Sequence, residues 1–249
     1  MIEEERVGDV VVLRFAHGKA SALDTEFLVE LERRMRAFEE GDGRACILTG
    51  TGGIFSAGVD LKRLLDGGDD YLAEFLPALE RAFTALFFSE KPVVGACNGH
   101  AIAGGCVILS CCDHRIGARG RGRIGVPELT VGVPFPPLAL EIIRFATPSS
   151  HLQDTLYEGA TFDMEQALAR GLVDELSLPD ELDDHAFAAA HRLARYPSGS
   201  FGFTTRLVRR PIADALAPHA ERDRAELRAL WGSAPVQDAI REYVERTLG

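Results

Sequence analysis

Apolar and polar residues repeat with two different periods along the first half of the chain, and each change of period predicts a new element. Val10–Phe15 is rich in β-branched residues and predicts a strand, as does Ala45–Thr49. Between them, Asp24 is placed to cap a helix that ends at Gly41. Its apolar residues recur three and four positions apart and are Phe27, Leu28, Leu31, Met35 and Phe38.

The alternation of strands and helices continues through the next seventy residues or so. A short helix is expected near Gly58 and a longer one over Tyr71–Phe88, followed by a buried strand in Lys91–Asn98. A helix of small and apolar residues is expected from Gly104, and another strand in Asp113–Ala118. This order is typical of an α/β protein with parallel strands.

The pattern becomes mostly helical after Thr161. We expect Thr161 to cap a helix that buries Ala167 and Leu168 and ends at Gly171. A further amphipathic helix is marked by Leu182, Ala186, Ala189, Ala190 and Leu193.

The segment Ala217–Leu248 is charged and helical in pattern. No linker or fixed-period repeat separates it from the rest of the chain. We therefore expect an α/β core over residues 1–195 and a helical region over residues 196–249.

Composition narrows the possible partners and compartment. Hydrophobic residues make up 46% of the chain and charged residues 26%, both ordinary for a globular protein. The net charge of −11 and the lack of a basic stripe argue against nucleic-acid binding. Apolar runs such as Pro92–Ile108 fall short of a membrane span. The acidic N-terminus does not resemble a secretion signal, so we expect a cytoplasmic protein without a membrane partner.

Cysteine usage gives no sign of a disulfide framework or a metal site. The five cysteines are an odd number in a chain without a secretion signal, and we expect buried free thiols. They are Cys46, Cys97, Cys106, Cys111 and Cys112. The run 111–114 (CCDH) is too compressed for a zinc site, and no metal is expected.

Common nucleotide and hydrolase motifs are incomplete. After Gly50–Gly53, Phe55 stands where a dinucleotide fingerprint needs its third glycine. Gly18-Lys19 is followed by alanine rather than by the residues of a phosphate loop. The surroundings of Ser56 (IFSAG) do not form a hydrolase elbow.

Three segments are informative together. They are Gly53–Lys62 (GIFSAGVDLK), Lys91–Gly105 (KPVVGACNGHAIAGG) and Gly125–Val133 (GVPELTVGV). Each alone could be a tight turn, a close helix contact or a surface loop. In this order, together with the loop Gly18–Leu23 and the stretch Thr161–Asp174, they resemble the crotonase family, the enoyl-CoA hydratase/isomerase superfamily.

The resemblance covers nearly the whole chain and implies a fold and an assembly. The implied fold is an α/β spiral of ββα turns followed by a C-terminal helical region. Members of the family usually form trimers, often paired into hexamers, so a homotrimer or hexamer is expected.

The resemblance also implies a chemistry. Acyl-CoA thioesters react in this family through an enolate, whose oxygen is held by two backbone N–H groups. The matching donors here are Val59 and Gly104, and such donors stabilise an oxyanion by roughly 3 kcal/mol each. Gly104 also lies near a predicted helix N-terminus, which favours an anion. Glycines at Gly104 and Gly105 are expected to let the thioester approach the backbone.

The family binds the CoA nucleotide over two loops that correspond to Lys19–Ala22 and Ala57–Lys62. Lys19, Lys62 or Arg63 could contact its phosphates. The complete set implied for the CoA ester is Lys19, Ala20, Ala22, Ala57, Val59, Asp60, Leu61, Lys62, Gly104 and Pro127. Coenzyme A is thus part of the substrate, and no permanently bound cofactor is expected.

The proton-transfer residues depart from the hydratase pattern. Typical hydratases carry two glutamates, and here Glu128 occupies the second place while Val107 occupies the first. Ala103 replaces the first of three glycines. A lone glutamate looks like an enoyl-CoA isomerase, in which one base moves a proton from C2 to C4. A hydratase with an incomplete pair and an idle acyl-CoA-binding homologue are the alternatives.

Overall fold

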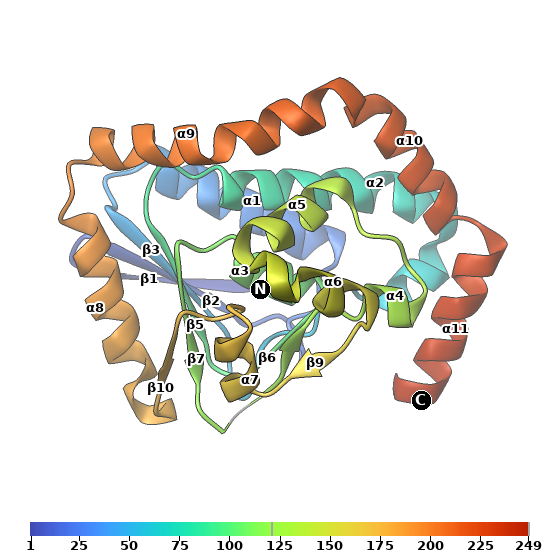
Figure 1. The fold of residues 1–249 in the computed structure, drawn as a ribbon, viewed down its shortest axis with the longest axis horizontal. Helices are drawn as coiled ribbons and strands as arrows, with labels where there is room; N and C mark the ends of the chain where they lie inside the picture. The colour runs from blue at the N-terminus through green and yellow to red at the C-terminus, as the bar shows by residue number, and fades with distance from the viewer. Residues whose placement is uncertain (121, 249) are drawn as a thin grey trace.

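The computed structural model describes residues 1–120 and 122–248, and its strands form two sheets (Figure 1). The larger sheet has six strands in the order β1-β2-β3-β5-β7-β10, and the smaller has four in the order β4-β6-β8-β9. The strands are β1 (Ile2–Val7), β2 (Val10–Phe15), β3 (Ala45–Thr49), β4 (Ile54–Ser56), β5 (Val93–Cys97), β6 (His100–Ile102), β7 (His114–Ala118), β8 (Ile124–Gly125), β9 (Thr161–Phe162) and β10 (Glu175–Ser177). In the larger sheet only β1 and β2 pair antiparallel, which confirms the expected α/β class.

Helices cover both faces of the larger sheet. They are α1 (Thr25–Glu40), α2 (Leu61–Phe87), α3 (Gly104–Ser110), α4 (Glu128–Val131), α5 (Pro137–Ala146), α6 (Ser149–Tyr157), α7 (Met164–Ala169), α8 (Leu182–Ala194), α9 (Ser198–Leu216), α10 (Ala220–Trp231) and α11 (Ala234–Leu248), with short 3₁₀ turns at Pro179–Glu181 and Ala217–His219. Successive side chains of a strand point to opposite faces of the sheet, so each strand contributes to both cores. Leu13 and Leu48 join the larger core with α1, α2 and α3, whereas Val12 and Ile47 meet α8 in a smaller one.

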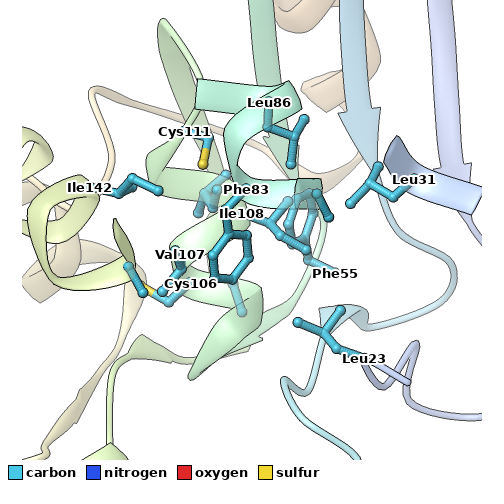
Figure 2. Packing of buried hydrophobic residues seen from close by; sticks show 14 of the residues in the cluster. Leu23, Leu31, Phe55, Phe83, Leu86, Cys106, Val107, Ile108, Cys111 and Ile142 are labelled. Atoms are coloured by element: carbon cyan, nitrogen blue, oxygen red, sulfur yellow. The ribbon is translucent and has the colours of Figure 1, made fainter. Parts of the chain in front are cut away.

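Several predicted elements are confirmed with their bounds. The strands Val10–Phe15 and Ala45–Thr49 are β2 and β3. Asp24 caps α1 by accepting a hydrogen bond of 2.8 Å from the N–H of Phe27, and the helix ends at Gly41. The amphipathic helix predicted around Ala186 is α8. All five cysteines are buried and free, and Figure 2 shows Cys106 and Cys111 among the apolar side chains of the larger core.

Strand β1 was not predicted, because only Ile2 of its six residues is buried and the rest of the strand is charged or exposed. Its position at the edge of the sheet explains this pattern, since an edge strand keeps charged side chains in water.

The two helices expected between residues 58 and 88 form α2, which has a kink at Gly68 (φ 57°, ψ −149°). The prediction that a helix starts near Gly58 is wrong by about one turn. Gly58 itself has a φ of +82°, which belongs to the preceding loop. Asp60 caps the helix instead, because its carboxylate accepts a hydrogen bond of 3.0 Å from the N–H of Arg63.

The expected cap at Thr161 is also wrong. Thr161 lies in β9, and α7 is capped by Asp163. Asp163 and Gln166 form a capping box, in which each side chain accepts a hydrogen bond from the other residue's N–H. The shifted start turns Ala167 into the core, as expected, but leaves Leu168 38% exposed.

The C-terminal helices wrap around the rest of the chain (Figure 1). Helix α10 packs against α2, and α11 packs against both α2 and α4. None of the helices in the described ranges is long and apolar enough to cross a membrane. The division at residue 195 stays a prediction.

Candidate active site

A cavity of about 560 Å³ opens between the loops after β2 and β4, the start of α3 and the C-terminal helices. The structure brings the complete set predicted for the CoA ester, together with Glu128, to its walls. These are Lys19, Ala20, Ala22, Ala57, Val59, Asp60, Leu61, Lys62, Gly104, Pro127 and Glu128. They come from four separate stretches of sequence that meet only in the folded chain.

The backbone around Val59 is fixed by pairing with the Leu23 loop. The N–H of Leu23 donates to the carbonyl of Gly58 at 2.8 Å, and the N–H of Asp60 donates to the carbonyl of Leu23 at 3.1 Å. Gly58 in turn lies against Gly104, because a Cβ built on Gly58 would be 3.2 Å from the amide nitrogen of Gly104. The two backbone segments that carry the predicted donors are therefore in contact.

Both predicted donor amides are available to a ligand. Gly104 is the first residue of α3, so its N–H has no acceptor within the helix. Across residues 1–120 and 122–248, neither Val59 nor Gly104 donates its N–H to another residue. An oxygen placed between the two segments could accept from both.

The glycines at the start of α3 serve packing more than ligand access. A Cβ on Gly105 would lie 2.4 Å from the carbonyl oxygen of Ser56, and one on Gly104 would lie 2.6 Å from a methyl group of Leu23. Gly105 does not line the cavity. The expectation that both glycines make room for the thioester is therefore wrong for Gly105, which makes room for β4.

Ala103 adopts a backbone conformation that favours glycine. Its φ is 51° and its ψ is −126°, and the residue is held there by a hydrogen bond of 2.8 Å from its N–H to the carbonyl of Gly125. Such conformations cost about 1–3 kcal/mol for a residue with a side chain. The fold therefore stores strain directly beside Gly104.

Glu128 combines burial with a lack of partners. It is the first residue of α4 and is 7% exposed. Within the described chain, its Oε2 atom has no hydrogen-bond partner. Burial among apolar groups disfavours the carboxylate and raises the pKa of Glu128 to about 8, although the backbone N–H of the same residue opposes the shift. The group can thus lose or take a proton near neutral pH.

The other candidates for proton transfer are weaker. Val107 lines the same cavity and is almost fully buried, but it carries no ionisable group. Of the described residues on the cavity wall, only Asp60 and Glu128 have carboxyl groups. Asp60 is engaged as the cap of α2.

Two lysines, but not the arginine, fit the predicted role in phosphate binding. Lys19 and Lys62 line the cavity and are exposed. Arg63 does not line it, because its guanidinium is bound to Asp24 (3.1 Å) and Glu26. The suggestion that Arg63 meets a CoA phosphate is therefore wrong.

Sequence reasoning missed the aromatic part of the wall. Trp231 of α10 and Tyr243 of α11 line the cavity, as do Leu79 and Phe83 of α2. The indole N–H of Trp231 donates to the carbonyl of Pro134 at 3.1 Å. The signal available was a single tryptophan in a highly charged helical segment.

Helix α11 is seated closely on α4. Gly132 ends α4 with a φ of +92°, and a Cβ there would lie 2.6 Å from the Cβ of Ala239 in α11. Any larger residue at this position would separate the two helices. This contact therefore fixes α11, which carries Tyr243, relative to α4, which carries Glu128.

Comparison with known proteins identifies the family. A family model described as enoyl-CoA hydratase/isomerase matches residues 5–248. The chain belongs to the enoyl-CoA hydratase/isomerase family. It is thus an acyl-CoA enzyme with the crotonase fold. No group of three or more metal-binding side chains occurs among the residues that the structure describes.

Relatives in this family carry both activities in their names. The chain is 27% identical to rat mitochondrial enoyl-CoA delta isomerase 1, over 99% of this chain and 86% of the rat protein. It is 28% identical to a probable enoyl-CoA hydratase of Rhizobium meliloti, over 91% of this chain and 87% of that protein.

The same is true of solved structures. The crystal structure of human mitochondrial delta3-delta2-enoyl-CoA isomerase is similar with a TM-score of 0.94 and 26% identity, and the match covers 98% of this chain and 97% of the human one. An enoyl-CoA hydratase from Mycobacterium marinum is similar with a TM-score of 0.82 and 27% identity, over 91% and 99% of the two chains.

Proposed function

We propose that this crotonase-family chain is an enoyl-CoA isomerase that moves a double bond from C3 to C2, with Glu128 as its single acid–base residue. The observation that carries the proposal is the cavity wall itself. Among the described lining residues, Glu128 has the one carboxyl group not already used as a helix cap, and Val107 occupies the other catalytic place.

The reaction follows from this arrangement. The thioester oxygen accepts hydrogen bonds from the N–H groups of Val59 and Gly104. The Glu128 carboxylate takes a proton from C2, and the negative charge spreads onto the oxygen as a dienolate. The carboxyl group then returns the proton at C4, which leaves the double bond between C2 and C3. Glu128 returns to its carboxylate form, and no water is consumed.

The pKa of Glu128 suits this cycle. A base that must both accept and return one proton works best when its pKa is near the working pH. Burial supplies that shift here, since the pKa is raised to about 8. The backbone donors supply charge stabilisation that water cannot provide in the apolar cavity.

The CoA moiety is assigned to the loops Lys19–Ala22 and Ala57–Lys62, with Lys19 and Lys62 near its phosphates. We also propose that copies of the chain assemble as a homotrimer or hexamer. Helix α9 supports this, because only Gly202 and Arg209 of its nineteen residues are buried. The cytoplasmic location stays a prediction.

The test compares two substrates of equal chain length at equal concentration, a 3-enoyl-CoA and a 2-enoyl-CoA. We expect double-bond migration in the first to be faster than hydration of the second. Val107→Glu should increase hydration measurably, though burial of the new carboxylate limits the gain. Hydration as fast as isomerisation in the natural sequence would favour the hydratase alternative, and binding of both esters without turnover would favour an idle acyl-CoA-binding protein.

A further inference from the structure

A second cavity of about 310 Å³ lies between α2 and α10. Phe83 of α2 and Pro136 before α5 line both this cavity and the larger one that holds Glu128. The two spaces therefore adjoin, and these two side chains stand between them.

The second cavity extends further along α2 than the larger one. The larger cavity meets this helix at Leu79 and Phe83, whereas the second meets it from Phe83 back to Leu72, about two turns before Leu79. A chain that extends along this helix away from Glu128 passes Phe83 and enters the second cavity.

The second cavity suits an alkyl chain. Its inner wall consists of leucines, alanines and prolines from α2, the start of α5 and α10, including Ala73 and Leu227. Four charged residues also line it. Arg224 donates to both carboxylate oxygens of Glu80 at 2.7 and 2.8 Å, Asp223 accepts from Arg222, and the fourth is Arg228. Since every other lining residue is apolar, the wall offers an incoming ligand mainly apolar contact.

We propose that the second cavity receives the far end of the acyl chain, so that the substrates are straight-chain enoyl-CoA esters long enough to pass Phe83 and Pro136. This inference rests on the function proposed above, because it places the thioester beside Glu128. Phe83 and Pro136 then determine specificity, since they set the width of the passage.

The test uses saturated acyl-CoA esters, from butanoyl-CoA to hexadecanoyl-CoA, and measures their dissociation constants by calorimetry. Saturated esters have no double bond to move, so their binding is independent of isomerisation. Affinity should rise by up to roughly fourfold per methylene while the tail enters apolar space, and the rise should continue from octanoyl-CoA to dodecanoyl-CoA.

A variant pair locates the tail. Ala73 lines only the second cavity, and Ala73→Trp should fill it. We expect the affinity for dodecanoyl-CoA to fall at least about tenfold, because several methylenes lose their apolar contact, while that for butanoyl-CoA stays within about twofold. Glu74→Trp is the control, since Glu74 is the next residue of α2, is exposed and lines neither cavity. It should leave both affinities unchanged.

Ala220→Trp fills the same cavity from the opposite wall and replaces Ala73→Trp if that variant does not fold. An affinity that stops rising at butanoyl-CoA, or an equal loss for short and long esters in the filled variants, overturns the proposal while leaving the assigned reaction intact. A clear chain-length dependence without turnover of any 3-enoyl-CoA supports the second cavity and refutes the isomerase. No binding of any ester refutes both.

Discussion

Two carboxyl groups are largely buried, one just before β7 and one at the start of α4, and they differ in what surrounds them. Asp113, the residue before β7, is bound by the guanidinium of Arg209 at 2.6 Å and by the N–H of Val93 at 2.8 Å. Arg209 also donates to the carbonyl of Phe87 and lies over its ring. Glu128 has no such partner for its Oε2 atom within the described chain.

The comparison shows how one kind of side chain serves two purposes. Burial raises the pKa of Asp113, but Arg209 and the N–H of Val93 stabilise its charged form and oppose this shift, and the same contacts tie β7 and β5 to α9. A buried carboxyl group without partners destabilises the fold in its charged form, but its pKa moves into the range where it can exchange protons. The presence or absence of one arginine separates the structural group from the chemical one.

The largest expected effect is on chemistry at Glu128. Glu128→Gln keeps the size of the side chain but removes its basicity, so exchange of the C2 proton of a bound acyl-CoA should fall about 10²- to 10⁴-fold. Exchange is followed in deuterated water by mass spectrometry, and ester binding by calorimetry should change little. Glu141→Gln is the control, because Glu141 pairs with Arg144 and does not line the cavity. Exchange at the unmodified rate in Glu128→Gln would refute the assignment of the base.

The next effect is on stability at Asp113. Asp113→Ala leaves the buried Arg209 without its counter-charge, so the free energy of unfolding should fall by about 3–5 kcal/mol. Urea denaturation measures it. Asp42→Ala is the matched control, since Asp42 pairs with Arg6 on the surface and should contribute less than about 1 kcal/mol. Equal losses of unfolding free energy in the two variants would mean that burial does not strengthen the contribution of the Asp113–Arg209 pair.

The backbone donors give a third test that separates side chain from main chain. Val59→Ala keeps the N–H and should retain most activity. Val59→Pro removes it and should lower turnover about 10²- to 10³-fold. This N–H has no acceptor within the described residues, so the proline breaks no internal hydrogen bond. Circular dichroism confirms that both variants fold, and a severe loss in Val59→Ala would show that the side chain itself matters.

A smaller effect is expected on the way the free energy of unfolding depends on pH. The pKa of Glu128 is about 8 in the folded protein against an ordinary 4.5, so between these values the folded state holds a proton that the unfolded state has lost. Stability from this group is therefore present at pH 4 and decreases as pH rises, by about 2–3 kcal/mol between pH 5 and pH 7. Glu128→Gln lacks this dependence. Denaturation curves at pH 5, 6 and 7 should show its advantage growing with pH, and parallel curves would contradict the shift.

The smallest effect is expected at Ala103. Ala103→Gly relieves the strain of the positive φ, partly offset by the greater freedom of glycine in the unfolded chain, for a net gain of about 1 kcal/mol. Ala101→Gly, two residues earlier in β6, has no such strain to relieve and should destabilise. Thermal denaturation of the two variants distinguishes strain from a general effect of glycine.

Local patterns predicted much of the fold, and motifs predicted the position of the site. β2, β3 and α1 are encoded by apolar spacing and a cap, which short-range physics determines. The cap of α7 at Asp163 was missed because Thr161 is also a good capping residue, and only the pairing of Thr161 in β9 decides between them.

The positions of Trp231 and Arg63 were not predicted correctly because both depend on long-range contacts. Trp231 reaches the cavity because α10 folds back along α2, and nothing in its neighbours along the chain indicates that. Arg63 is withdrawn from the site by Asp24 and Glu26, whose approach depends on how α1 meets α2. Contacts of this kind follow from topology, which single-sequence patterns do not contain.

The wall that α10 and α11 add to the cavity has a consequence for synthesis on the ribosome. Lys19 and Glu128 are made early, but Trp231 and Tyr243, which line the same space, follow Lys19 by more than two hundred residues. At about 5–20 residues per second, the N-terminal part of the wall waits roughly 10–45 seconds for the rest. During that interval the apolar pocket is open to water and to chaperones. An acyl-CoA that needs Trp231 and Tyr243 as well as the earlier lining residues binds only once translation has passed Tyr243, so ligand capture would report the finished chain.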